Sequence, residues 1–109
     1  MKRQCLRITL MGLVLSCATA QFDRASYDTN NTMTIAEREQ AVASIFFTTD
    51  PPGAAIFMGK KYVGRANREE VPVFPGQQVI TLIKDEYWYQ DTMIFREGNN
   101  GAREITLHK

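Results

Sequence analysis

Short apolar runs separated by Gly and Pro dominate the chain from residue 44 onward. Runs of this kind, bounded by residues that cannot continue a hydrogen-bonded ladder, are typical of β-strands. The pattern predicts strands at 45–49, 54–58, 61–64, 78–84, 92–96 and 104–108, of which 78–84 and 92–96 are the longest. Several short strands joined by Gly- and Pro-containing turns predict an all-β fold, a small antiparallel β-sandwich.

Two of the predicted turns have a clear chemical basis. Gly59 stands at the first central position of a two-residue turn, where a type II′ hairpin requires a positive φ that glycine adopts at low cost. The cluster of Gly and Asn at 97–101 predicts a turn before the last strand.

The segment before the strands has a different pattern. Residues 21–33 are rich in Asp, Asn, Thr and Ser, with only Phe22, Tyr27 and Met33 as large apolar side chains, which predicts a flexible tether. Thr34 and Glu37 then have the spacing of a capping box, so a short helix is expected at 35–43. A helix this short is marginal alone, so it must pack on something or fray.

The first twenty residues form a third pattern. Three basic residues (Lys2, Arg3 and Arg7) flank an apolar run at 8–15, and small residues follow at 16, 18 and 20. This arrangement is typical of an export signal, and the run is too short to span a bilayer. We therefore expect 1–20 to be a signal peptide, 21–43 to be the tether and short helix, and 44–109 to be the folded domain.

Two cleavage sites are compatible with this leader. Ala18-Thr19-Ala20 is a small-x-small site for an ordinary signal peptidase. The sequence 14–17, Val-Leu-Ser-Cys, resembles a bacterial lipobox, in which Cys17 would receive a diacylglycerol group and become the new N-terminus after loss of 1–16. Both remain open, and the lipobox is the favoured interpretation, with Cys17 as the lipid attachment site.

Removal of the leader changes the charge balance. The whole chain has 13 Lys+Arg and 12 Asp+Glu. The leader holds three of the basic residues and no acidic one, so 10 basic and 12 acidic residues remain, a net charge of −2. Nucleic acid is then not an expected partner. Cys5 and Cys17 both fall in or at the end of the leader, so no disulfide can stabilise the domain.

The order of motifs from residue 44 to 109 resembles that of a PEGA domain. The Pro-x-Gly-Ala motif is represented by Pro51, Pro52, Gly53 and Ala54. The elements that follow in the expected order are Ile56 and Met58 on a hydrophobic strand, Gly64, the Pro75-Gly76 turn, Ile80 and Leu82 on a long strand, and Tyr87 as an aromatic. The sequence departs from the usual pattern at Gly59-Lys60, at Ala66-Asn67 and at Glu86.

The resemblance implies a β-sandwich in which the motif residues are structural. It also implies a binding or adaptor role in the cell envelope, without catalytic residues.

The chemistry-bearing residues agree with a non-enzymatic role. His108 is the only histidine, and a lone histidine builds neither a metal site nor a catalytic triad unless other groups converge on it. Glu69-Glu70 and Asp85-Glu86 are adjacent pairs, and adjacent residues on an extended chain point to opposite faces. We expect these groups to be solvated, with no catalytic residue, no metal site and no cofactor.

Aromatic residues are the best candidates for recognition. Tyr87, Trp88 and Tyr89 are consecutive and alternate faces if the chain is extended. Either Tyr87 fills the core with the other two at its rim, or Trp88 and Tyr89 form a recognition patch with Tyr62.

The long strands add a second part to this predicted recognition surface. If Ile80 and Leu82 face the core, then Val79, Thr81 and Ile83 face outward and form an apolar face that requires a cover. The helix at 35–43, a partner protein or a second copy of the chain could provide it.

These patterns together predict a non-enzymatic binding or adaptor module of the bacterial cell envelope. It would be exported to the periplasm or held by lipid at the outer membrane, and would dock a partner protein or a glycan. A homo-oligomer is compatible with the apolar face. The alternative is a small periplasmic enzyme or inhibitor without a recognisable motif.

Overall fold

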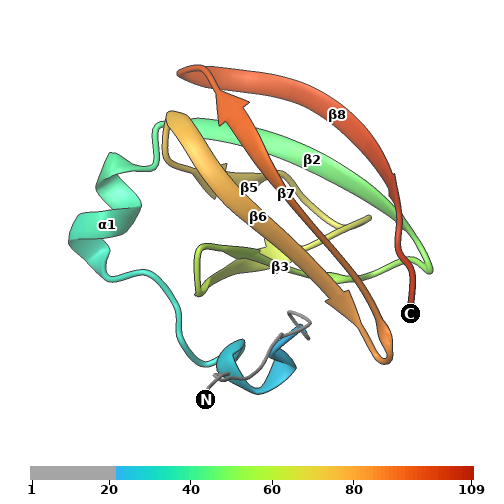
Figure 1. Cartoon of the computed structure of the whole chain (residues 1–109). Helices are drawn as coiled ribbons and strands as arrows, with labels where there is room; N and C mark the ends of the chain where they lie inside the picture. The colour runs from blue at the N-terminus through green and yellow to red at the C-terminus, as the bar shows by residue number, and fades with distance from the viewer. Residues whose placement is uncertain (1–21) are drawn as a thin grey trace, which may run out of the picture.

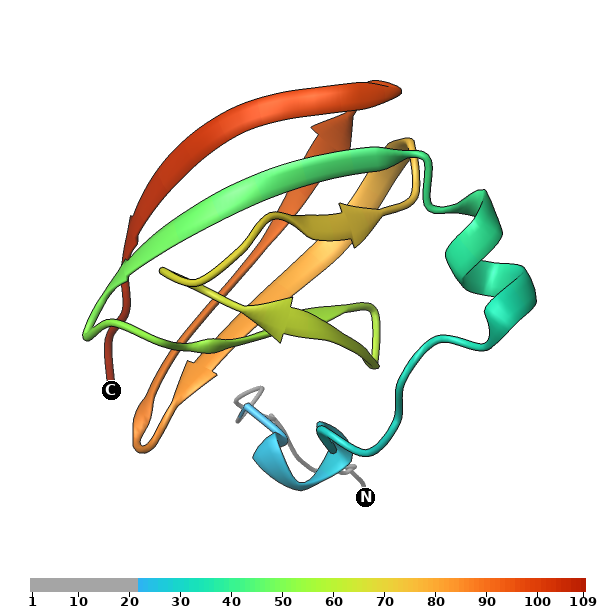
Figure 2. The same ribbon diagram turned by 180° about the vertical axis from the view of Figure 1, so that it is seen from behind.

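The structure, a computed structural model, describes residues 22–109. The predicted leader, Cys17 and Gln21 lie outside the described residues. The described part contains a short 3-10 helix, one α-helix and seven strands (Figures 1 and 2). In chain order they are η1 (Arg24–Ser26), α1 (Ile35–Gln40), β2 (Ala43–Asp50), β3 (Ala55–Met58), β4 (Lys61–Arg65), β5 (Val71–Val73), β6 (Gly76–Lys84), β7 (Tyr87–Phe95) and β8 (Gly98–Thr106).

The strands form two sheets that pack face to face. One sheet has the order β5-β2-β8 and the other has the order β4-β3-β6-β7. The predicted small all-β sandwich is therefore confirmed. The expectation of purely antiparallel pairing is wrong at one place, because β2 and β8 pair in parallel from Ala43↔Gly98 to Asp50↔Thr106. The chain crosses from the end of β7 to the opposite sheet and then runs alongside its own first strand.

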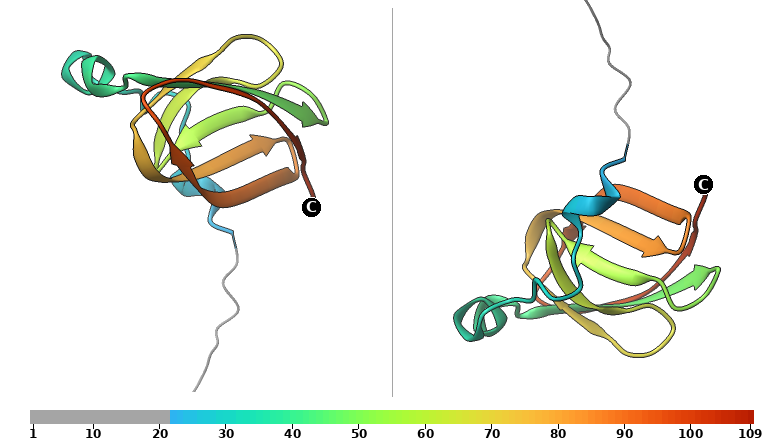
Figure 3. Two further views of the ribbon diagram at one scale, coloured as in Figure 1. Left: turned by 90° about the horizontal axis from the view of Figure 1, so that it is seen from above. Right: turned by 90° about the horizontal axis from the view of Figure 1, so that it is seen from below.

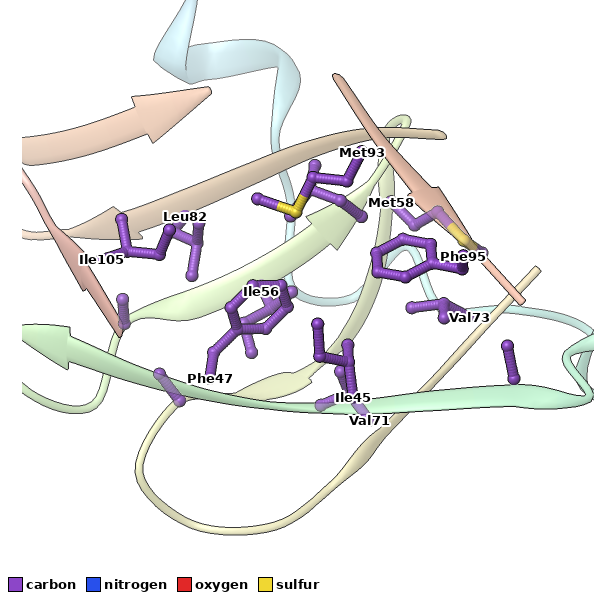
Figure 4. Packing of buried hydrophobic residues seen from close by; sticks show 14 of the residues in the cluster. Ile45, Phe47, Ile56, Met58, Val71, Val73, Leu82, Met93, Phe95 and Ile105 are labelled. Atoms are coloured by element: carbon purple, nitrogen blue, oxygen red, sulfur yellow. The ribbon is translucent and has the colours of Figure 1, made fainter. Parts of the chain in front are cut away.

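The core lies between the two sheets and follows the period of two that strands impose. Along β2 every second side chain is buried, from Ala43 to Thr49. The facing side chains of the other sheet are aliphatic or aromatic and almost completely buried (Figure 4). The main contributors are Ile45, Phe47, Ile56, Met58, Val71, Val73, Ile80, Leu82, Met93, Phe95 and Ile105. Tyr87 is half-buried against this cluster, as the family resemblance implied.

Two strand boundaries differ strongly from the prediction, and β5 was not among the predicted strands. β7 begins at Tyr87 rather than at 92, because it pairs with β6 without interruption from Gly76↔Phe95 to Lys84↔Tyr87. Its polar residues are tolerated because β7 is an edge strand. β8 covers Gly98–Thr106 rather than 104–108, so the cluster at 97–101 is mostly strand.

Asn100 explains why the Gly- and Asn-rich cluster is ordered as strand. Its side-chain amide nitrogen donates to the carbonyl oxygens of Arg96, Gly98 and Ser44 at 2.9 to 3.2 Å. Its side-chain oxygen accepts from the Arg96 N–H at 3.0 Å. One side chain thus links the end of β7 to the start of β8 and to β2.

The Pro-Pro-Gly-Ala turn has the backbone geometry expected for its glycine. Gly53 has a φ of 81°, in the region that glycine adopts at low cost. The side-chain oxygen of Asn67 accepts hydrogen bonds from the Gly53 N–H at 3.0 Å and from the Thr49 N–H at 3.2 Å. Asn67 itself has a φ of 65°, and its own N–H donates to the Phe47 carbonyl. Asn67, at a position where the sequence departs from the family pattern, therefore holds the motif turn against β2.

Helix α1 has the predicted capping box. The Thr34 hydroxyl accepts from the Glu37 N–H at 3.1 Å, and the Glu37 carboxylate accepts from the Thr34 N–H at 2.9 Å. The hydrogen bond from the Thr34 backbone is the main cause that lowers the pKa of Glu37. The helix ends at Gln40 instead of 43, since Ala43 already belongs to β2.

The helix does not cover a sheet. None of its residues is buried, and Ile35 is 81% exposed. Figure 3 shows α1 standing to the side of both sheets, where the Glu37 carboxylate pairs with Lys61 of β4 at 3.5 Å. Of the covers considered for the outward face of the long strands, the helix is therefore excluded, because its apolar residues point to solvent.

A candidate binding site on the four-stranded sheet

Part of the outer face of the four-stranded sheet is covered by residues 22–33, which we call the strap, while Val79 and Ile94 on the same face stay exposed. The strap contains η1, and Figure 3 shows η1 lying against β6 and β7. Met33 is buried in the core cluster, and Phe22 and Tyr27 are half-buried. The prediction of a flexible tether is therefore wrong for the strap. Its polar residues face solvent, whereas its three large apolar side chains each contact the domain.

Three aromatic rings from the strap and the sheet form what we call the ring stack. Phe22 lies between the other two rings, parallel to both. Its centroid is 4.3 Å from that of Trp88 with 4° between the planes, and 5.3 Å from that of Tyr27 with 14° between the planes. On its far side Trp88 contacts the His108 ring at 4.6 Å. Tyr27 also meets Phe57 of β3 edge to face, at 5.3 Å. The N-terminal end of the strap is thus held mainly by ring contacts.

Hydrogen bonds hold the middle of the strap to the strands. The Gln90 amide nitrogen on β7 donates to the Tyr27 hydroxyl at 2.9 Å and to the Thr81 hydroxyl at 3.0 Å. The Tyr62 N–H donates to the Asn31 carbonyl at 2.9 Å, and the Asn31 side chain donates to the Lys60 carbonyl at 3.0 Å. Tyr27 and Asn31 therefore fix the strap at two separate points.

A shallow pocket of about 260 Å³ opens beside the ring stack. Its aromatic wall consists of the three stacked rings. Its polar wall contains a carboxylate, a hydroxyl, an ammonium group and an amide, from Asp23, Ser26, Lys60 and Gln90. The Lys60 ammonium lies 5.3 Å from the centre of the Tyr27 ring, within cation–π distance. This combination of flat rings and mixed polar groups can bind a ligand that has both an apolar face and a polar edge.

The predicted recognition residues have different places in this arrangement. Thr81 is fully buried under Tyr27 and Gln90, and Ile83 is half-buried opposite Trp88 in the β6–β7 register. Val79 is 44% exposed.

The predicted aromatic residues are split between the two faces of the sheet. Tyr62 packs edge to face on Phe57 at 5.7 Å, on the same face as Trp88. Tyr89 is on the inner face, packed against the core, and its hydroxyl donates to Asp91 at 3.2 Å. Burial is the first cause that raises the pKa of Tyr89, and the hydrogen bond to Asp91 adds to it. The structure thus brings Trp88 into the pocket and places Tyr89 away from it.

The sequence prediction missed six of the seven residues that line this pocket, namely Phe22, Asp23, Ser26, Tyr27, Lys60 and Gln90. The prediction of a tether rested on the average composition of the strap, and an average does not reveal a few apolar side chains, far apart in the segment, that contact the domain. Gln90 could have been found from strand parity, because it lies two residues from Trp88 and must share its face. No pattern in the sequence pairs Phe22 with Trp88, which is 66 residues away.

Other polar groups of the described chain are dispersed. His108 is exposed and contacts Trp88, and the Glu69-Glu70 and Asp85-Glu86 pairs are exposed. Within residues 22–109, no three or more His, Cys, Asp or Glu side chains are grouped so that they could hold a metal ion. A second shallow pocket, of about 210 Å³, lies over β2 and β8 between Thr48 and Glu104. In the same range, no helix is long and apolar enough to cross a membrane.

The fold and the turn chemistry define a small β-sandwich module with a covered outer face. A sequence model of the PEGA domain matches residues 42–109, more than half of the chain. The chain therefore belongs to the PEGA domain family. Comparison with curated proteins and with solved structures gives no match.

Proposed function

We propose that this protein is a non-catalytic cell-envelope module that docks a partner protein or a glycan at the pocket beside the ring stack. Membership of the PEGA family indicates a non-catalytic, envelope-associated module and names no partner. The docking role follows from the pocket, in which three stacked rings meet a rim of mixed polar groups. Aromatic rings supply contact area at low entropic cost, and the rim supplies orientation.

The leader supports a location outside the cytoplasm, in the periplasm or at the outer membrane. Its basic start, apolar run and small residues are those of an export signal. If Cys17 carries lipid, Phe22 follows five residues later, and the strap then enters the domain directly at the ring stack. The pocket would lie at the membrane-proximal end of the domain, within reach of molecules attached to the same membrane.

Fractionation of cells that make the full chain tests the location. We expect the protein in the envelope fraction, with Cys17→Ser moving it from the membrane to the soluble periplasm. Mass spectrometry of the mature N-terminus distinguishes acylated Cys17 from free Gln21. Recovery of the full chain in the cytosol would contradict an envelope role.

Retention of envelope components tests the docking role. The mature protein is immobilised and exposed to the protein and polysaccharide fractions of solubilised envelopes. We expect Tyr27→Ala to lose a component that the unchanged protein retains, because Tyr27 forms one wall of the pocket. Tyr89→Phe is the matched control, since Tyr89 lies on the opposite face of the sheet. Equal retention by all three proteins would contradict the proposed site.

A further inference from the structure

We propose that the slot between Tyr27 and Trp88 binds one pyranose ring of a glycan, and that Phe22 is its displaceable internal occupant. This proposal rests on the proposed function and deepens it by naming the class of ligand. It assigns Phe22 a role beyond that of a packing residue.

The geometry of the ring stack defines the shape of the slot. The planes of Tyr27 and Trp88 are each within 14° of the Phe22 plane, and both rings lie at stacking distance from it. The slot is therefore flat and one ring thick. The outer faces of its walls are already in contact with other groups, because Lys60 lies over Tyr27 and His108 lies against Trp88. A ligand that stacks on both rings must take the place of Phe22.

The rim of the slot favours a sugar over an apolar ring. A pyranose has a flat face of C–H groups and an edge of hydroxyls, and each hydroxyl both donates and accepts hydrogen bonds. The adjoining pocket offers a donor on the Lys60 ammonium and acceptors on the Asp23 carboxylate, the Ser26 hydroxyl oxygen and the Gln90 amide oxygen. A phenyl ring has no polar edge to pair with these groups. The adjoining pocket, of about 260 Å³, leaves room for the hydroxyl substituents of such a sugar ring.

The attachment of Phe22 permits displacement without loss of the strap. Among residues 22–109, Phe22 is held by its ring contacts, and its carbonyl accepts from the N–H of Arg24 within the same turn. Tyr27 keeps its own hydrogen bond from Gln90 and its contact with Phe57. Asn31 and Met33 hold the rest of the strap. One wall of the slot therefore stays in place when Phe22 leaves.

Trp88 is the single tryptophan of the chain, so its fluorescence reports directly on the slot. The purified mature protein is titrated with three probes, chitotetraose, cellotetraose and maltotetraose. We expect a saturable change in Trp88 emission with at least one of them. A site that must first release its internal occupant binds more weakly than the free site. We therefore expect Phe22→Ala to lower the dissociation constant by about fivefold or more.

Three further variants separate binding from folding. Tyr27→Ala removes one wall and should raise the dissociation constant at least about tenfold. Tyr89→Phe is the matched control and should leave it unchanged. Phe22→Leu keeps an apolar side chain but has no flat ring. It therefore replaces Phe22→Ala in the titration if Phe22→Ala is poorly folded. Denaturation curves of each variant confirm that the domain is folded at the titration temperature.

Two outcomes overturn the proposal. One is that neither the unchanged protein nor Phe22→Ala shows a change in Trp88 emission with any probe up to about 10 mM. That concentration is well above a millimolar dissociation constant, so even weak binding would be detected. The other is weaker binding by Phe22→Ala, since a purely structural Phe22 supports the site rather than blocking it. If no sugar binds while Tyr27→Ala still loses an envelope protein, the proposed docking function stands with a protein partner and the glycan assignment fails.

Discussion

The two faces of the four-stranded sheet are covered in different ways. The inner face is closed by a second sheet, and its side chains, such as Ile56 and Leu82, are fully buried aliphatic residues. The outer face is covered only in part, by the strap, a single segment that contributes Phe22 and Tyr27. On β3 the two environments alternate residue by residue, since Ile56 faces the core and Phe57 faces the strap.

A strand that is apolar on both faces can therefore be covered by two different kinds of contact. Strands of the opposite sheet are held by ladders of backbone hydrogen bonds and cannot leave singly. The strap has few backbone bonds to the sheet and depends on side chains. The inner face therefore determines the global free energy of unfolding, while the outer face determines a local opening.

Truncation on the inner face should have the largest effect. Ile80 is fully buried between the sheets, so Ile80→Ala leaves a cavity there and should lower the free energy of unfolding by about 2 to 5 kcal/mol. Chemical denaturation of the mature protein measures this loss. Ile94→Ala is the matched control on a neighbouring strand, because Ile94 is 78% exposed and should change stability by less than about 0.5 kcal/mol. Equal losses from both variants would show that the described core does not dominate stability.

The turn that connects the two sheets should be the next most sensitive position. Gly53 has a positive φ, and a β-branched side chain adopts that backbone conformation poorly. Gly53→Val should cost about 1 to 3 kcal/mol by thermal denaturation. A Cβ atom at Gly53 meets nothing within 4 Å, so the cost is conformational and not steric. Gly53→Asn should recover much of the loss, since asparagine tolerates positive φ, and an equal loss for both would contradict this assignment.

Truncation on the outer face should have a smaller and more local effect. Tyr27→Ala removes the contacts with Phe22 and Phe57 and the hydrogen bond from Gln90. We expect a loss of about 1 to 2 kcal/mol. Proteolysis within the strap should accelerate more than proteolysis within β3. If the strap stays as protected as the sheet, the two faces do not differ in the way we describe.

The inner face should also respond to alkaline pH through Tyr89. Burial and the neighbouring Asp91 raise the pKa of Tyr89 above the ordinary value of 10.0, so the folded state favours the neutral phenol. This contribution is fully present below pH 10 and is lost as the pH rises through the folded-state pKa. Tyr89→Phe should flatten the fall of the unfolding free energy above about pH 10. An unchanged slope would exclude Tyr89 as its source.

The capped helix should have the smallest effect on the domain. Thr34→Ala removes half of the capping box and should fray α1, which amide hydrogen exchange at 35–40 would detect. Because no residue of α1 is buried, the global free energy of unfolding should change by less than about 0.5 kcal/mol. A larger global loss would mean that α1 supports the sandwich.

Strand periodicity allowed most of the sandwich to be predicted from the sequence. Alternation along 78–84 correctly placed Ile80 and Leu82 in the core, and the capping box correctly located the start of α1. These features depend on local chemistry. The strand boundaries of β7 and β8 were wrong because pairing partners, and not local propensity, extend them.

The candidate site was harder to predict because it joins distant parts of the chain. Trp88 was identified as a recognition residue from its type, whereas Phe22 and Tyr27 were assigned to a tether from the composition around them. The composition of a segment is an average over its residues, whereas the binding of that segment to the sheet depends on a few individual side chains. The role of Asn67 at the motif turn was likewise invisible, since it depends on a positive φ and on three hydrogen-bond donors from β2 and the turn.

The parallel pairing of β2 with β8 also determines the order in which the molecule can form. β2 is synthesised first among the strands and β8 last, and more than fifty residues separate Ala43 from its partner Gly98. Contacts of such high sequence separation slow folding, because the whole intervening chain must be closed into a loop. The hairpins of the four-stranded sheet involve close neighbours and can form earlier. The three-stranded sheet is therefore complete only when its last strand is available, and until then one edge of β2, with its unpaired backbone N–H and C=O groups, is open to solvent and to other chains.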